Sequence, residues 1–206
     1  MSTPESHAAL RGLLRDKVHI QPGTLSRLPT QQAAHLRSPL DLGRLLLAPL
    51  DGAPAELLRF WLAHPCGHAV INPLRHGYLP GVQAVGRRQH DGVAWIAAAR
   101  LLAEPGLAEP LASLLDHLLG SDGQLDGPRL SGGAGRSAAW AEVGQRIQRQ
   151  FSLGYAPAEA AASSHAYFAW GLRIYLAGAH GLSVVDPGLE RLLRTTVLDS
   201  RFWQRA

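Results

Sequence analysis

DGVAWIAAARLLAE, residues 91–104, is the stretch of the sequence that decides the fold. Ala and Leu are strong helix formers, and Asp91 is a residue type that often caps a helix N-terminus. The stretch therefore predicts a helix from Val93 to Glu104. If that is right, an apolar run at the centre of the chain is helical, and little remains from which to build a sheet.

The segments on either side repeat the helical pattern, with apolar residues every three to four positions and Pro or Gly at the ends. Further helices are expected at 54–63, 137–151, 157–177 and from Pro187 onward. Val18–Ile20 is expected to be briefly extended, and Val82–Val85 fits either a short strand or a helical turn. We predict an all-α fold, a compact bundle of about eight helices with Pro/Gly-rich connections.

The length of 206 residues fits a single helical domain, residues 1–206. Residues 121–135 contain five Gly, one Pro and two Asp, a composition that does not build a regular element. This loop is interpreted as an internal linker or mobile flap, joining possible sub-parts 1–120 and 136–206.

Charged residues make up only 17% of the chain, and hydrophobic residues 46%. The low charge leaves apolar residues to cover part of the surface, which often marks a partner-binding face. Lys17 is the one lysine beside 19 arginines, a bias typical of a GC-rich bacterial genome or of selection for phosphate and carboxylate contacts. A net charge of +4 is modest for a dedicated DNA-binding domain.

A single cysteine, Cys66, cannot form an internal disulfide, which suits a reducing compartment. The first residues contain no basic segment followed by an apolar run, so no secretory signal is expected. The longest candidate membrane span, 156–177, is interrupted by Glu159, His165 and Arg173. We therefore expect a cytoplasmic protein without a membrane span.

Two segments of the chain resemble each other. LRFWLAHPCGHAVINP (58–73) and LRIYLAGAHGLSVVDP (172–187) share seven of sixteen positions. In both, a helix is expected to end, Gly67 or Gly181 to reverse the chain, and a short apolar run to follow in extended form. The resemblance therefore predicts matching bends near the two glycines, arising from duplication or from coincidence between similar connections.

His64, Cys66 and His68, with His76 downstream, form the densest group of possible metal ligands. Zinc requires three or four such ligands in a tetrahedral arrangement. The spacing matches no zinc-finger pattern, and His64 is not followed by the Glu of a zincin motif. The preferred interpretation is structural, no cofactor is predicted, and a metal-dependent enzyme with a site near residues 64–76 remains an alternative.

Basic residues give the two other candidate sites. Arg136 lies in a glycine-rich loop entering a helix, which could hold an anion but lacks the spacing of a phosphate-binding loop. If the last helix continues past Asp199, four further arginines share one side of it, as either a solvated face or a contact for an acidic partner or nucleic acid. They are Arg191, Arg194, Arg201 and Arg205.

No catalytic signature is present in the sequence, so no catalytic residue is proposed from it and an enzymatic role is not favoured. The expected function is a non-catalytic helical protein–protein interaction module, such as an adaptor, chaperone or assembly subunit, whose partner is another protein. The alternatives are a nucleic-acid-binding accessory protein and the metal-dependent enzyme described above.

Overall fold

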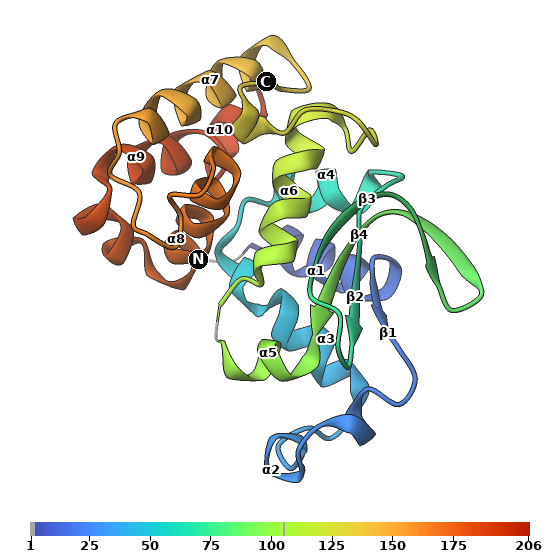
Figure 1. Cartoon of the computed structure of the whole chain (residues 1–206). Helices are drawn as coiled ribbons and strands as arrows, with labels where there is room; N and C mark the ends of the chain where they lie inside the picture. Colours follow the sequence, from blue (N-terminus) through green and yellow to red (C-terminus); the bar gives the residue numbers. More distant parts are fainter. Residues whose placement is uncertain (1–2, 105) are drawn as a thin grey trace.

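The computed structural model describes residues 3–104 and 106–206, except for the side chain of residue 179. It contains 56% helix and 13% strand, with a four-stranded mixed sheet against which helices pack (Figure 1). The predicted all-α bundle is therefore wrong, and the fold is α/β.

The error lies in the stretch 91–104. Residues Arg88–Ala97 form strand β4, and only Ala98–Ala103 form a helix, α5. β4 is a central strand, and Val93 to Ala97 are all buried, so its side chains on both faces are shielded from solvent. Such a strand has no alternation of polar and apolar residues, so its pattern does not distinguish it from a buried helix.

The sheet has the strand order β1-β2-β4-β3. Strand β1 (Val18–Ile20), strand β2 (His68–Asn72) and β4 run parallel, and β3 (Gly77–Val85) is antiparallel to β4. The extended conformation predicted for Val18–Ile20 is confirmed. Val82–Val85, which the sequence left open, is the end of β3.

Helices cover one face of the sheet and extend beyond it. They are α1 (Pro4–Asp16), α2 (Thr30–Ala33), α3 (Pro39–Leu47), α4 (Ala55–Ala63), α6 (Glu109–Ser121), α7 (Ala138–Ser152), α8 (Ser164–Val185), α9 (Pro187–Thr195) and α10 (Ser200–Trp203). No helix among the described residues is long and apolar enough to cross a membrane.

A single hydrophobic cluster reaches from the sheet to the C-terminal helices, and includes Leu13, Ile96, Leu115, Trp140 and Leu193. The glycine-rich loop 121–135 packs against this cluster through its second half, where Leu130 is fully buried. A Cβ at Gly120 would lie 2.3 Å from the backbone nitrogen of Leu130, so α6 and the loop touch at the backbone.

The two similar segments do not share a conformation, although a backbone irregularity lies near each of the two glycines. Gly67 has a φ of +86° and leads from α4 into β2, as expected. In the second segment α8 continues through Gly181, and its non-helical residue is Gly178. The apolar run 69–71 is extended because β1 and β4 pair with it, whereas the corresponding run 183–185 is helical.

Candidate metal centre

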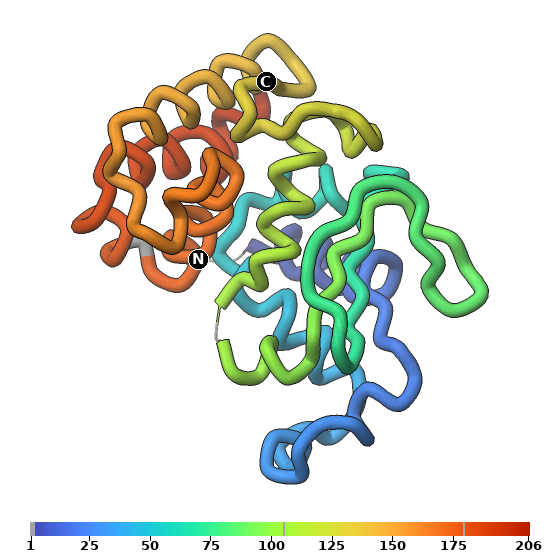
Figure 2. Tube along the Cα trace, in the orientation of Figure 1, coloured from blue at the N-terminus to red at the C-terminus, as the bar shows by residue number. Residues whose placement is uncertain are grey.

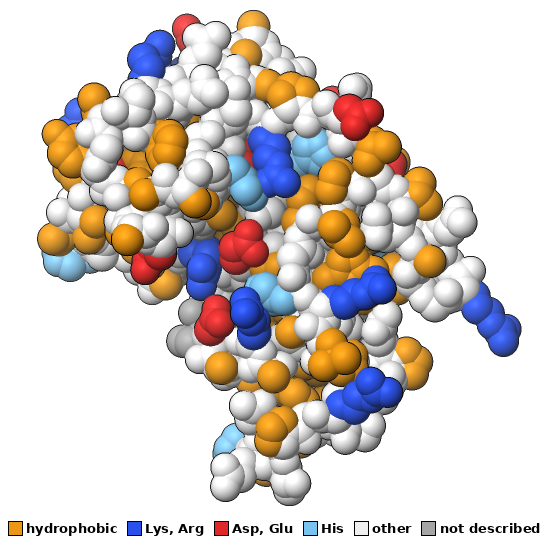
Figure 3. Space-filling view, in the orientation of Figure 1, with side chains coloured by type: hydrophobic (Ala, Val, Ile, Leu, Met, Phe, Trp, Pro, Cys, Tyr) orange, Lys and Arg blue, Asp and Glu red, His pale blue; other side chains and the backbone are white. Residues whose placement is uncertain are grey.

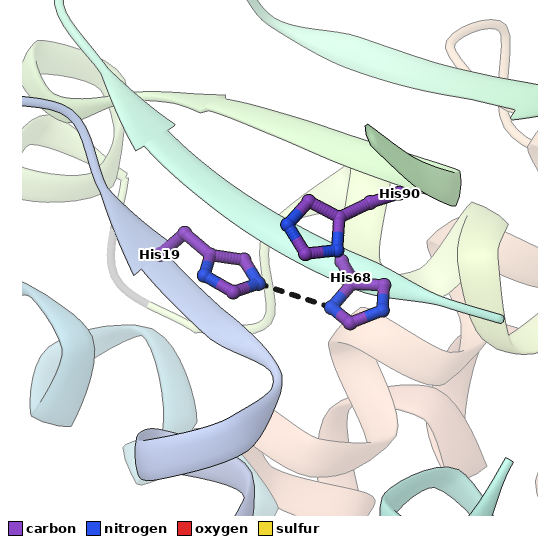
Figure 4. Close-up of side chains that lie close together, drawn as sticks. All are labelled: His19, His68 and His90. Atoms are coloured by element: carbon purple, nitrogen blue, oxygen red, sulfur yellow. Dashed lines mark hydrogen bonds between the residues drawn. The ribbon is translucent and has the colours of Figure 1, made fainter. Parts of the chain in front are cut away.

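Three histidines from three strands converge on the sheet: His19 of β1, His68 of β2 and His90 of β4 (Figure 4). One potential ligand atom from each ring lies within 4.8 Å of the others. The Nε2 atom of His19 is 3.0 Å from Nδ1 of His68, and the ring centre of His90 is 4.4 and 4.2 Å from those of His19 and His68. In the described part of the chain, no other group of three or more His, Cys, Asp or Glu side chains is as close.

Strand pairing brings the first two histidines together. His19 is paired with Val70, and His68 lies two residues before Val70 on the same strand. Because side chains two apart on a strand point to the same face, His19 and His68 share a face of the sheet. The two residues are 49 positions apart in the sequence, and the pairing of β1 with β2 makes them neighbours.

The third histidine reaches this face through an irregularity in β4. His68 is paired with Val93, and His90 lies three residues before Val93, an offset that would place it on the opposite face of a regular strand. Gly92, with a φ of +65°, interrupts the alternation where β3 and β4 change register. Only glycine adopts this conformation without steric cost.

The histidines lie on the face of the sheet opposite the main core. Ala94 and Ile96 belong to the core that the helices cover, whereas Val70, Val93 and Trp95 form a small separate cluster on the other face. The three histidines beside this cluster are each half-buried, and a groove borders His19 and His90.

Burial keeps these imidazoles neutral at pH 7. It lowers the pKa of His19 to about 4, with a further contribution from His90, and lowers the pKa of His68 to about 3, with a further contribution from Lys17. Burial also lowers the pKa of His90. The neutral imidazole is the form that binds a metal.

One buried nitrogen of the cluster has no hydrogen-bond partner among the described residues. Nε2 of His90 is buried and forms no hydrogen bond with any described group. Such an atom costs about 1–3 kcal/mol and calls for an explanation such as a bound ion. The imidazole of His68 donates a hydrogen bond to the backbone carbonyl oxygen of Pro65, the kind of outer contact that orients a metal-binding imidazole. Three imidazoles are a donor set that suits zinc.

Of the four ligands predicted from the sequence, only His68 belongs to this cluster. His64 accepts a hydrogen bond at Nδ1 from the backbone of Cys66, 3.2 Å away. The Sγ atom of Cys66 lies 3.6 Å from a carboxylate oxygen of Asp91. Burial, followed by this carboxylate, raises the pKa of the Cys66 thiol, so the thiol is protonated and a poor nucleophile at neutral pH.

His76 lies elsewhere, in a small hollow where α5, α6 and α8 meet. Arg100, Glu104, Glu109 and Arg173 line it with His76. Charged and histidine side chains gather along the middle of the face shown in Figure 3, between the C-terminal helices and the sheet. The hollow has a volume of only about 10 Å³, enough for one water molecule at most.

The four C-terminal arginines do not form one helical stripe. Helix α9 ends at Thr195, and Thr196 has a non-helical φ and ψ of −135° and −88°. Arg191 and Arg194 are therefore on α9, whereas Arg201 is on α10 and Arg205 follows it. Arg136 lies 3.5 Å from Asp122 and stacks over Phe60. Their binding of an anion or a partner stays a prediction.

A second polar cluster has the connectivity of a catalytic triad. His165 Nδ1 lies 2.7 Å from an oxygen of Asp116, and His165 Nε2 lies 3.1 Å from Oγ of Ser113. The Ser113 hydroxyl donates to Glu109, however, and only 1% of Ser113 is exposed. A nucleophile must reach its substrate, so we interpret this cluster as a structural connection between α6 and α8.

Comparison of the chain with protein families, with curated proteins and with solved structures finds no match in any of the three. The geometry of the histidine cluster is therefore the main basis for a functional inference. The roles in binding another protein or nucleic acid, expected from composition, stay predictions.

Proposed function

We propose that this protein binds a divalent transition metal, with zinc as the best fit, through His19, His68 and His90. The observation that supports this most strongly is the convergence of three neutral imidazoles from three strands. The unpartnered Nε2 of His90 adds to it, because a metal ion would satisfy a nitrogen that no described group satisfies.

The donor set indicates the kind of site. Structural zinc sites have four protein ligands, whereas catalytic sites have three and leave the fourth position to water or substrate. The described part of the chain supplies three imidazoles and no fourth ligand within the cluster. A zinc ion there would hold a water molecule and lower its pKa, so the proposed centre is of the open, reactive type.

Titration calorimetry with zinc tests the proposal. Wild-type protein, freed of metal by a chelator, should bind one zinc ion per chain. His90→Gln should weaken binding by at least about tenfold, because a ligand is lost. His180→Gln is the matched control: it removes an exposed histidine from α8 and should leave the affinity unchanged.

Two further variants separate this site from the one predicted from the sequence. His19→Gln should weaken zinc binding as His90→Gln does, and Cys66→Ser should not. Equal affinity of the wild type and both histidine variants, or loss of binding in Cys66→Ser alone, would contradict the proposal.

A further inference from the structure

A groove borders two of the three histidines. It lies between the end of β1, residues 19–22, and the β3–β4 hairpin, residues 85–90, and has a volume of about 360 Å³. His19 and His90 are part of its wall. The hairpin extends beyond the other strands (green in Figure 2). The volume is that of a small-molecule site.

The groove carries positive charge and no negative charge. Arg88 lines it, Gln21 is its other long polar side chain, and no carboxylate is among its lining residues. Arg88 shares the wall of this groove with His19 and His90. Arg88 is exposed, and no described carboxylate pairs with it.

This charge distribution matters for a metal bound by neutral ligands. Three imidazoles leave the double positive charge of the ion uncompensated in a half-buried position, where charge is costly. Arg88 in the groove wall adds to the positive potential, as does the buried Lys17, whose ammonium donates to the carbonyl of Cys66, two residues before His68. An anion in the fourth coordination position would offset the positive charges of both the metal and Arg88. The guanidinium group of Arg88 is suited to two parallel hydrogen bonds with an oxyanion.

We infer that the groove is the ligand side of the metal centre, and that a small oxyanion, a carboxylate or phosphate group, binds there between the metal and Arg88. This inference rests on the proposed metal site.

Cobalt substitution tests the inference, because visible absorption of Co²⁺ reports its ligands. The Co²⁺-loaded protein is titrated separately with inorganic phosphate and with acetate, at constant ionic strength set by a non-coordinating salt. At least one of the two anions should change the spectrum up to a plateau as its concentration rises. Arg88→Ala should weaken the binding of that anion by about tenfold or more, without weakening the binding of Co²⁺.

Arg87→Ala is the matched control, because it removes the same charge from the adjacent position, and Arg87 does not line the groove. It should weaken anion binding less than threefold. Equal weakening of anion binding by the two variants would mean that the net charge of the protein, not Arg88 in the groove, causes the effect, and this would overturn the inference. Co²⁺ binding with no response to either anion would overturn the inference alone, whereas failure to bind Co²⁺ or zinc would overturn the metal site as well.

Discussion

Gly92 is the single residue on which the histidine cluster depends most. Its φ of +65° interrupts the alternation of β4 between His90 and Val93. A Cβ at this position would be strained by the positive φ and would lie 3.2 Å from Oη of Tyr78, a tight contact. The direction of the His90 ring therefore depends on a glycine that is not itself a ligand.

Gly92→Ala should lower the free energy of unfolding by about 1–2 kcal/mol, the cost of a positive φ in a residue with a Cβ. It should also weaken zinc binding, because the misplaced His90 no longer completes the cluster. Urea unfolding and calorimetry measure the two effects. Gly52→Ala is the control, because Gly52 does not have a positive φ and a Cβ there would have no atom within 4 Å. A variant that bound zinc as tightly as the wild type would show that Gly92 does not position His90.

At the scale of elements, the connection between α6, the loop after it and α8 rests on Asp116. This fully buried carboxylate accepts hydrogen bonds from the backbone nitrogen of Ser131 at 2.8 Å and its hydroxyl at 2.6 Å. His165 of α8 contacts the same carboxylate. One side chain therefore holds three segments together.

Asp116→Ala should lower the free energy of unfolding by about 3 kcal/mol, because it leaves buried donors without an acceptor. Denaturant unfolding measures this loss. Asp126→Ala, in the exposed part of the same loop, should change stability by less than about 0.5 kcal/mol. Similar small effects of both substitutions would mean that the Asp116 network does not stabilise the fold.

The sequence predicts several of the helices correctly but not the sheet, and the reason lies in the individual elements. The helices over 54–63 and 137–151 follow from their apolar spacing and are confirmed, with ends shifted by a residue. The sequence predicts a helix where β4 lies, because a strand buried on both faces has no alternation of polar and apolar residues. His68 was among the predicted ligands, but His19 and His90 become its neighbours only through strand pairing, which composition and spacing do not show.

Across the whole molecule, burial is the main cause of a lowered pKa in six histidines: His19, His64, His68, His76, His90 and His117. Each has a lower pKa in the folded chain than the value of about 6.5 in the unfolded chain. As the pH falls below 6.5, the unfolded chain therefore takes up protons before the folded chain does. The stability present above pH 6.5 is lost progressively toward the folded pKa values, about 4 for His19 and about 3 for His68.

The metal-free protein should accordingly be less stable at pH 5 than at pH 7. We expect a loss of about 2 kcal/mol, well below the full linkage value because most of these rings are partly exposed to solvent. Urea unfolding with a chelator present at both pH values measures it. Asp16 and Asp41 also have lowered pKa values, but they change the pH dependence of stability only below about pH 4, outside the range between pH 5 and pH 7. Equal or greater stability at pH 5 would contradict the expectation.

The most direct test of the metal centre is a crystal structure of the zinc-loaded protein with anomalous scattering at the zinc edge. The account predicts one peak about 2.0–2.1 Å from Nε2 of His19, from Nδ1 of His68 and from a ring nitrogen of His90, with its fourth ligand toward the groove. A peak beside His64 and Cys66, or no ordered peak among the three histidines, would contradict it.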